Sequence, residues 1–582
     1  MLAACTFSAT AQTADRSKQV ADNWESINQR PYPQWFSDAK LGIFVHWGLY
    51  SIPAYASPEG YGEWFYKGLM AGDEGRKAAM LRLGAKRDQS PLEQYSLLPK
   101  QWKAEMWDPA EWAELFKEAG AKYVVLVTKH HDGYCLWDWK KPALDDWTSV
   151  LSGPERNIVG ELTEAVRNEG MKMGFYYSLT EWTNPIHTWT VMPNDSNSVH
   201  TYVREYMIPQ IKDLVNKYKP SLLFTDGDWD NTCEQFRAED VISWYYNAVG
   251  PEAIVNDRWG QGTQHGFRTP EYSNGIVDND RPWAECRGLG RSFGVNHNEP
   301  LSNYLTSDEL IQHFVKLVAA GGGLTLNVGP EADGRIPLLQ QERLKDLGAW
   351  LRTNGEAIYG TTPYSRYGEI EPVVIERKDK VIDFDWVRNS PDPRIACDDF
   401  KAEWHGMFSL PTAGVYTISA EADDFVEVVL FGTQVIDNKQ DINSFTMKFS
   451  ANFEYPIDVY YKERDREARV HLYIEGKDMP RQPLQPIGAF SATYQCEQPY
   501  VCYTRKGGNL YAIALGFPQE DLRLNLPDIS PSTKITLLGS GKELKWIYNS
   551  DGQVVIDTRS LGYSDIAASR AAWVFKLENA IR

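Results

Sequence analysis

The sequence has few cysteines, and none of them has a metal-binding or redox spacing. The seven cysteines among 582 residues are scattered, and no C-x-x-C pair occurs. A disulfide scaffold or a structural zinc site needs paired cysteines, so neither is indicated. Cys496 and Cys502 are close enough in sequence to form a disulfide across a turn.

Long apolar runs and an excess of positive charge are also missing. No stretch reaches the roughly 18 apolar residues that a membrane-spanning helix needs, so we predict no membrane span. Lys and Arg number 60 against 79 Asp and Glu, a formal net charge of −19. Nucleic acid and anionic membranes would repel such a surface, so we expect neither as a partner. No glycine-rich loop follows the first apolar segment, which argues against a nucleotide site.

The N-terminus indicates export. MLAAC resembles the end of a bacterial lipoprotein signal, with Cys5 as a candidate lipid anchor, and Ala9-Thr10-Ala11 is typical of an ordinary secretory cleavage site. We therefore expect residues 1–20 to be a remnant of a signal. The protein would be periplasmic or anchored to the outer membrane of a bacterium. The alternative is an N-terminus that is simply disordered.

Apolar strands and amphipathic helices alternate over the first 360 residues. Such alternation predicts a parallel sheet covered by helices, and six or seven units fit a closed (β/α)8 barrel better than an open sheet. One or two strands, around Trp283, are hard to recognise. The predicted strands are residues 41–48, 123–128, 173–178, 221–224, 253–260 and 323–330, and the predicted helices are residues 109–120, 157–171, 203–218, 238–249 and 307–320.

Polar side chains follow the ends of these strands. In a barrel they would face one mouth, where ligands of such proteins bind. An isolated DGD, as at Asp226, is more often a turn, and a single histidine is more often structural. If His130 and His131 continue a regular strand, they point to opposite faces. The strand-end residues are His46, His130, His131, Tyr176, Asp226, Arg258 and Asn327.

Two kinds of chemistry suit these residues. A zinc hydrolase is one, although no HxH or HExxH occurs and neighbouring histidines are a poor metal pair. A sugar pocket is the other, because neutral histidines exchange hydrogen bonds with hydroxyls beside aromatic rings such as Trp47 and Trp64. Sugar hydrolysis needs two carboxyl groups. Asp226 is one candidate, and Glu271 or Glu285 is the other.

An ordered set of motifs over about residues 30 to 365 resembles glycoside hydrolase family 29, the α-L-fucosidases. The motifs are LGIFVHWG, YGEWF, TKHHDGYCLW, GFYYSLTEW, LLFTDGDWD, NDRWG, SFGVN, LTLNVGP and NGEAIYGTTPY. The resemblance implies a (β/α)8 barrel and a retaining double displacement on terminal α-L-fucose, without metal or organic cofactor. The implied partner is a fucosylated oligosaccharide or glycoconjugate.

Carried over by position, the resemblance assigns roles. Asp226 matches the nucleophile. Glu271, in Arg268-Thr269-Pro270-Glu271-Tyr272, matches one of two family positions for the acid/base; Glu285 lies one residue after the other position, which is Ala284, and is the alternative. Phe224 replaces a tryptophan that many members have, so we expect altered pocket contacts. The implied substrate-binding residues are His46, Glu63, Trp64, His130, His131, Tyr176, Arg258 and Phe293.

The last third of the chain changes character to short alternating segments and turns, which predict all-β structure. Residues 375–490 resemble a PA14 module, and residues 491–582 resemble the β-sandwich that follows the barrel in this family. We therefore expect a catalytic domain at residues 21–365 followed by two β-sandwich domains, with the module inserted within or before the sandwich. Asp423 and Asp424 occupy a place where some such modules hold calcium, but a structural role is expected here.

Two alternatives to a retaining exo-α-L-fucosidase remain open at the sequence level. One is a barrel glycosidase that acts on another α-linked sugar, such as galactose. The other is a sugar-binding protein that has lost its activity, because the glutamate of the second family position is displaced by one residue.

Overall fold

The structure is a computed structural model that describes residues 19–189, 192, 194–273, 280–387, 390–392, 394–464, 468–526 and 529–581. It contains two compact units. The first holds the described residues up to Thr269 together with 280–306 and 323–349, and the second holds residues 270–273, 307–322 and the described residues from Trp350 onward. Residues 1–18, including Cys5, lie outside the described residues.

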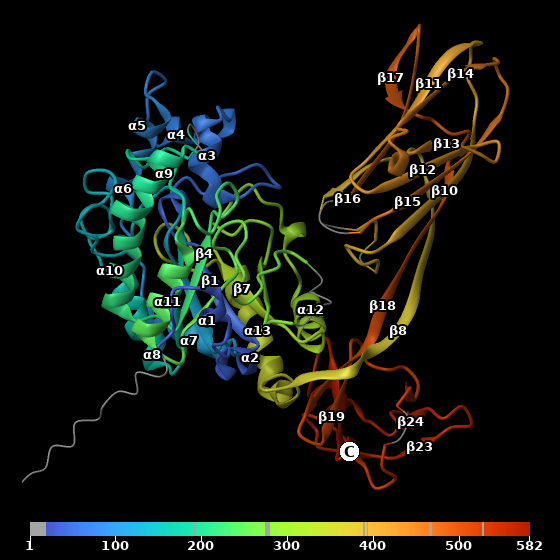
Figure 1. Ribbon diagram of the computed structural model, residues 1–582. Helices are drawn as coiled ribbons and strands as arrows, with labels where there is room; N and C mark the ends of the chain where they lie inside the picture. The colour runs from blue at the N-terminus through green and yellow to red at the C-terminus, as the bar shows by residue number, and fades with distance from the viewer. Residues whose placement is uncertain are drawn as a thin grey trace, which may run out of the picture. The chain divides into compact units, whose positions relative to one another are not determined.

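A curled parallel sheet of seven strands forms the centre of the first unit, in the order β5-β4-β3-β2-β1-β7-β6 (Figure 1). All its neighbouring strands are parallel, as the alternating pattern predicts. The strands are β1 Leu41–Val45, β2 Tyr123–Lys129, β3 Lys172–Ser178, β4 Leu222–Asp226, β5 Ile254–Val255, β6 Ala284–Gly288 and β7 Gly323–Val328.

The gap between the two edge strands is bridged by a segment too short to be recognised as a strand. Phe267 pairs in parallel with Asn256, just after β5, and Arg268 pairs in parallel with Trp283, just before β6. Backbone hydrogen bonds from Phe267 N to Val255 O (3.0 Å) and from Ala284 N to Arg268 O (3.1 Å) complete the bridge. This two-residue segment occupies the eighth position of the ring, and two residues are too few for a strand pattern to be recognised in the sequence.

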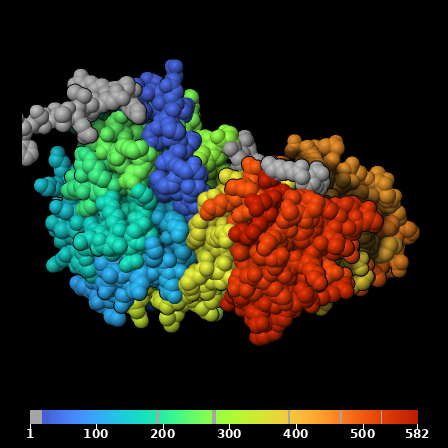
Figure 2. Space-filling model, turned by 90° about the horizontal axis from the view of Figure 1, so that it is seen from below, coloured from blue at the N-terminus to red at the C-terminus, as the bar shows by residue number. Residues whose placement is uncertain are grey.

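Helices surround the sheet, and Figure 1 shows α7, α8, α10 and α11 around β1, β4 and β7. Side-chain caps stabilise the first turns of two of these helices. The Asp108 side chain accepts a hydrogen bond from Ala110 N before α7, and the Asn157 side chain accepts one from Gly160 N before α8. Figure 2 shows blue, cyan and green segments side by side on the surface of this unit. The helices are α1 Trp24–Asn28, α2 Gln34–Ala39, α3 Phe65–Met70, α4 Glu74–Arg82, α5 Pro91–Tyr95, α6 Leu98–Gln101, α7 Pro109–Glu118, α8 Ile158–Asn168, α9 Ser196–Tyr202, α10 Ile208–Tyr218, α11 Ala238–Val249 and α13 Leu338–Asn354, which begins in this unit.

Every second residue of these strands points into the ring, because successive side chains of a strand alternate between its faces. The buried cluster inside includes Phe44 of β1, Tyr176 of β3 and Phe224 of β4. Two residues beyond Phe44 and Phe224, the same alternation directs His46 and Asp226 inward at the ends of their strands. Asp226 therefore faces the interior of the ring at its open end.

The second unit is mainly antiparallel β-structure. Its long strands β8 and β18 pair with each other from Phe490↔Asp379 to Arg505↔Thr362, and Figure 1 shows them running side by side through the unit. The helices are α12 Ser307–Ala319 and α14 Tyr563–Ile566; the strands are β8 Thr362–Asp379, β9 Asp383–Val387, β10 Lys401–Phe408, β11 Gly414–Ala422, β12 Phe425–Leu430, β13 Thr433–Asp437, β14 Ser444–Phe449, β15 Tyr455–Lys462, β16 Ala468–Gly476, β17 Met479–Pro483, β18 Phe490–Lys506, β19 Asn509–Ala514, β20 Leu522–Leu524, β21 Lys534–Leu537, β22 Glu543–Leu544, β23 Trp546–Tyr548, β24 Val554–Ile556 and β25 Trp573–Glu578.

Two hydrophobic cores lie in this unit. One includes Trp404, Val428 and Leu472, and the other includes Tyr503, Ala512 and Phe575. Strand β18 contributes residues to both cores. Strands β9 to β17 lie in the chain between β8 and β18. Four of them, β10, β12, β13 and β15, join the sheet that contains β8 and β18, and the others form a second sheet.

Two predictions concern residues of this unit: a disulfide between Cys496 and Cys502, and a structural role for Asp423 and Asp424. Cys496 and Cys502 are both free and buried on the single strand β18, so the prediction of a disulfide between them is wrong. Asp423 Oδ1 accepts hydrogen bonds from the Tyr461 hydroxyl (2.9 Å) and Arg469 N (3.1 Å), and Asp424 Oδ2 accepts from Arg464 N (2.7 Å). These bonds hold neighbouring backbone segments together and support the structural role expected for the pair.

Candidate functional site

Asp226 is the centre of the site. It is the last residue of β4, and its side chain is 15% exposed. The Tyr176 hydroxyl donates to Oδ2 (3.0 Å), Arg258 Nη1 donates to Oδ1 (3.3 Å), and His131 Nε2 lies 3.6 Å from Oδ2. Three side chains from different parts of the chain, those of Tyr176, Arg258 and His131, thus converge on the Asp226 carboxylate.

The surroundings of Asp226 keep it ionised. Burial by itself raises the pKa of Asp226, but the interaction with His131 and the positive charge of Arg258 outweigh it and hold the pKa well below its usual range. The pKa of Asp228, two residues on, is instead raised, by burial and by the charge of Asp226. Asp226 is thus held in its ionised form, and part of its side chain remains exposed.

The glycine after Asp226 is required by the close approach of two neighbours. Gly227 has φ +85°, and a Cβ there would lie 2.6 Å from Thr180 Oγ1 and 2.8 Å from His131 Cε1. The DG sequence therefore allows His131 to approach the carboxylate.

Arg258 is fixed independently of the carboxylate. Its Nε donates to Thr269 Oγ1 (3.0 Å) and its Nη2 donates to the Thr269 carbonyl (3.0 Å). These bonds aim Nη1 at Asp226, so the cation is already in place before any ligand binds.

His130 and His131 converge, because they lie beyond the end of β2 and the condition under which they would point to opposite faces does not hold. Strand β2 ends at Lys129, so strand alternation does not apply to them. Their ring centroids lie 4.8 Å apart. His131 Nδ1 is held by Thr180 (3.0 Å to Oγ1), while the His130 ring stacks 5.8 Å from Tyr176. Both histidines therefore belong to the site.

Neither histidine has all its nitrogens bonded. Among the described residues, His130 Nδ1 and His131 Nε2 are buried without a hydrogen-bond partner. Burial and the neighbouring His131 lower the pKa of His130 well below its ordinary value. A neutral ring with a buried, unbonded nitrogen is suited to a ligand hydroxyl.

His46 is held in one tautomer by Asn327. Asn327 Nδ2 donates to the Phe293 carbonyl (2.7 Å), so its Oδ1 accepts from His46 Nδ1 (2.6 Å). This leaves His46 Nε2 as the acceptor nitrogen. Burial lowers the pKa of His46 to about 4, so the ring is neutral at physiological pH.

Glu63 and Phe293 form one connected wall. Glu63 lies in the 3₁₀ turn Gly62–Trp64, is 3% exposed, and its Oε2 accepts from Gly294 N (2.8 Å). This bond fixes the loop that carries Phe293, whose ring centroid lies 4.9 Å from that of His46. Trp64 follows Glu63, half-buried, with its ring 6.4 Å from His131. Trp64 therefore lies near His131, and Glu63 holds the loop whose Phe293 ring lies beside His46.

Trp47 is the predicted pocket aromatic that the structure places elsewhere. It is 1% exposed, donates from Nε1 to the Glu331 carbonyl (2.8 Å), and packs against Trp102, Trp107 and Trp112. It fills the core because His46 and Trp47 are adjacent in the sequence and their side chains point in different directions.

The two acid/base candidates differ in their environment. Glu285 is 0% exposed in β6, and it lies between Ala284 and Cys286, which belong to the cluster inside the ring. Strand alternation therefore directs Glu285 away from the interior that Asp226 faces. Glu271 is half-buried outside the regular strands and is counted with the second unit.

The sequence reasoning missed Tyr50. It is 1% exposed, its ring lies 5.6 Å from that of His130, and its hydroxyl has no hydrogen-bond partner among the described residues. Its place in a short 3₁₀ turn, Leu49–Ser51, gives no strand-end signal that could have indicated it.

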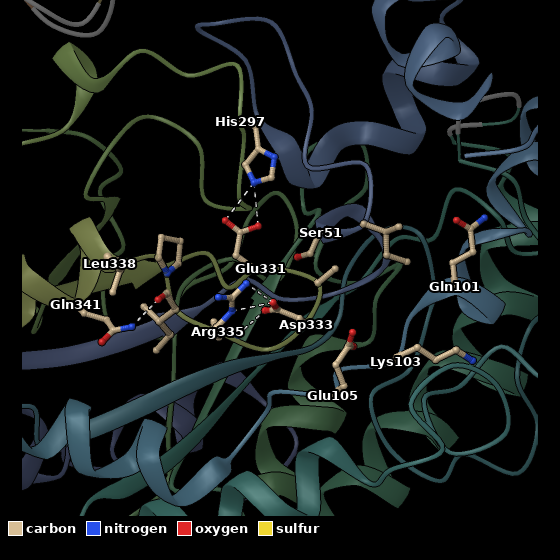
Figure 3. A pocket seen from close by; sticks show the side chains of 14 residues that line it. Ser51, Gln101, Lys103, Glu105, His297, Glu331, Asp333, Arg335, Leu338 and Gln341 are labelled. Atoms are coloured by element: carbon tan, nitrogen blue, oxygen red, sulfur yellow. Dashed lines mark hydrogen bonds and ion pairs between the residues drawn. The ribbon is translucent and has the colours of Figure 1, made fainter. Parts of the chain in front are cut away.

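A separate cavity of about 740 Å³ lies elsewhere on the first unit (Figure 3). Four of its charged groups form two pairs: His297 Nε2 lies 2.9 Å from Glu331 Oε2, and Arg335 lies 2.6 Å from Asp333 Oδ2. Figure 3 shows both pairs within the cavity wall. None of the predicted site residues lines it. We locate the chemistry at Asp226, where unbonded nitrogens and an ionised carboxylate meet.

The described residues contain no group of three or more His, Cys, Asp or Glu side chains arranged to hold a metal ion. They also contain no helix with the length and apolar character to cross a bilayer.

Comparison with protein families gives three matches along the chain. The family described as alpha-L-fucosidase matches residues 7–356, the PA14 domain matches residues 360–484, and the alpha-L-fucosidase C-terminal domain matches residues 495–578.

Individual proteins agree with these matches. An alpha-L-fucosidase from Dictyostelium discoideum is 38% identical over 357 residues, covering 60% of this chain and 76% of that protein. The tissue alpha-L-fucosidase of Homo sapiens is 37% identical over 363 residues, covering 61% and 75%. The crystal structure of Thermotoga maritima alpha-fucosidase in complex with a mechanism based inhibitor is 28% identical, with a TM-score of 0.64, covering 96% of this chain and 100% of that one.

Proposed function

Because the chain belongs to the alpha-L-fucosidase family and is a glycoside hydrolase, we propose that it is a retaining exo-α-L-fucosidase that releases terminal α-L-fucose from glycans. One observation carries the proposal. The Asp226 carboxylate, kept ionised by His131 and Arg258, is partly exposed at the open end of the ring near His130, whose buried Nδ1 has no hydrogen-bond partner among the described residues.

The proposed reaction has two steps. In the first, an Asp226 oxygen attacks the anomeric carbon while Glu271 gives its proton to the leaving oxygen, so the glycosidic bond breaks and a fucosyl ester forms. In the second, the Glu271 carboxylate takes a proton from water, the water oxygen attacks the same carbon, and the ester bond to Asp226 breaks. Two inversions return fucose with retained configuration.

Glu271 is the proposed acid/base because Glu285 is poorly placed for the task. Proton transfer needs a carboxyl group within hydrogen-bond reach of the leaving oxygen. Glu285 has no exposed surface and is directed away from the interior, whereas Glu271 is half-buried. A retaining mechanism requires Asp226 and Glu271 to lie about 5 Å apart.

The proposed fucose pocket combines hydroxyl-binding and apolar groups. His46 Nε2, His130 Nδ1 and His131 Nε2 would bond the sugar hydroxyls together with Glu63, and Phe293 and Trp64 would receive the C6 methyl group. Tyr176 and Arg258 hold the nucleophile. A galactosidase of the same layout would need a polar group at C6, and the Phe293 ring beside His46 favours fucose.

Domain boundaries and location are also proposals. We assign residues 21–365 to the catalytic domain, 375–490 to the PA14-like module and 491–582 to the C-terminal sandwich; residue 491 lies within β18. Export to the periplasm or outer membrane, with residues 1–20 as a signal remnant and Cys5 as a lipid anchor, is supported by the MLAAC sequence.

Azide rescue of Asp226→Ala tests the proposal. Hydrolysis of nitrophenyl α-L-fucoside should fall at least ~100-fold, and azide should restore turnover and give β-fucosyl azide, because azide replaces the missing nucleophile from the same face. The matched control is Asp228→Ala, which should keep most of its activity and give no azide product. Unchanged activity in Asp226→Ala would refute the assignment, and faster hydrolysis of nitrophenyl α-galactoside than of the fucoside by the unmodified enzyme would favour the rival substrate.

A further inference from the structure

Three tryptophans from separate segments meet beside the nucleophile. Trp64 follows Glu63 at the end of its 3₁₀ turn, Trp182 follows β3, and Trp229 follows β4. The Trp64 ring centroid lies 5.4 Å from that of Trp182 and 5.5 Å from that of Trp229. We call these three residues the tryptophan wall.

His131 joins the tryptophan wall to Asp226. Its ring stacks on Trp182 at 4.8 Å and lies 5.0 Å from Trp229, while its Nε2 is 3.6 Å from Asp226 Oδ2. One imidazole ring therefore separates Trp229 from the nucleophile. A group bound against Trp229 would lie next to the bond that is cleaved.

Trp229 is much more exposed than a residue of a buried aromatic cluster would be. Trp182 is 3% exposed, but Trp229 is 41% exposed, and Trp64 is half-buried. Large aromatic surface left in water beside a catalytic group is typical of ligand-binding surfaces. Indole faces suit the apolar C–H face of a pyranose ring, and the indole edge remains free for polar contacts.

A lysine holds the wall together. Lys67 of α3 places Nζ 4.4 Å from the Trp64 ring centroid, 5.6 Å from that of Trp182 and 5.8 Å from that of Trp229. Within the described part of the chain, no carboxylate lies within ion-pair distance of it. Its cation–π contacts to three rings therefore fix their arrangement.

We propose that the exposed end of the tryptophan wall, at Trp229, is the binding subsite for the leaving group, and that it takes a neutral pyranose ring stacked on Trp229. Lys67 acts as a positioning residue that pins the three rings. The inference rests on the proposed function of Asp226, because a leaving-group subsite presupposes a glycosidic bond cleaved there. It makes the natural substrate a fucosyl oligosaccharide rather than a fucoside of an alcohol or a small group.

Two substrates separate this subsite from the fucose pocket. α-L-Fucosyl fluoride has a one-atom leaving group that cannot reach the wall, whereas a fucosyl disaccharide places a sugar ring there. The disaccharide is whichever of α1,2-linked fucosyl-galactose, α1,3-linked fucosyl-N-acetylglucosamine and α1,6-linked fucosyl-N-acetylglucosamine the unmodified enzyme hydrolyses fastest. Inhibition by free fucose reports the fucose pocket alone.

In Trp229→Ala, kcat/KM for the disaccharide should fall roughly 10- to 50-fold. Its kcat/KM for fucosyl fluoride and its inhibition by fucose should change less than about threefold. Trp229→Phe should recover much of the disaccharide activity because it keeps a ring. Lys67→Met should lose roughly two- to tenfold on the disaccharide and less on the fluoride. Tyr563→Ala, at a residue 87% exposed in the second unit, is the matched control and should change neither rate.

The outcomes are distinct. Equal losses of Trp229→Ala on both substrates, or weaker inhibition by fucose, would place Trp229 in the fucose pocket and overturn the proposal. So would no loss on the disaccharide, or an unmodified enzyme that hydrolyses the fluoride and none of the disaccharides. If the unmodified enzyme hydrolyses neither kind of substrate, the proposed function itself fails.

Discussion

Replacing Lys129 with Met should destabilise the first unit strongly, because it would leave a buried charge without its partner. Lys129 Nζ donates to Glu181 Oε1 (2.6 Å), and both side chains are 0% exposed. Lys129 also bonds Gln210 Oε1 (3.2 Å), and Glu181 Oε2 accepts from Asn184 Nδ2 (2.8 Å). Glu181 in Lys129→Met would thus keep a desolvated negative charge with one amide donor.

The magnitude follows from this burial. Breaking a buried pair by removing one partner costs about 3–5 kcal/mol. For a domain of about 300 residues, the entropy of unfolding is roughly 0.6 kcal/mol/K, so the melting temperature should fall by about 5–8 °C. Differential scanning calorimetry, with denaturant unfolding followed by tryptophan fluorescence, measures both quantities.

The control is a matched pair on the surface of the same unit. Lys172 and Glu252 also form an ion pair, but their side chains are 40% and 41% exposed. Lys172→Met should therefore cost less than about 1 kcal/mol. The double variant Lys129→Met/Glu181→Gln should regain at least half of the loss, since no charge remains buried. Equal, small losses in Lys129→Met and Lys172→Met would refute the reasoning.

The same pair has a catalytic consequence. Lys129 directly precedes His130, and Glu181 directly follows Thr180, which holds His131 Nδ1. The pair joins the two segments that aim these histidines. In Lys129→Met, kcat/KM measured well below the melting temperature should therefore also fall, and the double variant should recover it together with the stability.

Two further predictions concern the site. Tyr176→Phe removes a hydrogen bond to the proposed nucleophile and should lower kcat roughly 5- to 30-fold with little change in KM. Steady-state kinetics on nitrophenyl fucoside measure both constants. A change confined to KM would contradict the role given to the hydroxyl. Burial lowers the pKa of His46 from 6.5 to about 4. Between these pH values the unfolded chain therefore binds more protons than the folded protein. The stability that His46 contributes is complete above about pH 6.5 and is lost as the pH falls toward 4. The free energy of unfolding of the unmodified protein, minus that of His46→Gln, should fall by about 3 kcal/mol over this range, and a flat difference would contradict the buried neutral ring.

The local sequence was enough to predict six strands of the parallel sheet, five of the longer amphipathic helices and the candidate residue Asp226. Apolar runs such as those before Asp226 and His46 can only be buried strands, and Pro, Asn, Asp and Gly mark the helix ends. Parallel strands bring their carboxyl ends to one rim. The convergence of Asp226, His131, Tyr176 and Arg258 therefore follows from order along the chain, and the family resemblance adds the roles proposed for them.

The tertiary structure decided what depends on partners far away in the chain. The sequence shows no strand at 267–268, because two residues carry no periodicity and pair only through neighbours brought to them. His130 and His131 converge because both follow the end of β2 at Lys129, where strand alternation no longer applies. In the sequence, Lys129 and Glu181 resemble surface charges, and only the folding of the chain pairs them in the interior. The tryptophan wall likewise forms only where three separate segments meet. Local pattern fixes which elements form; their packing alone fixes which side chains meet, because contact energies depend on distance in space and not along the chain.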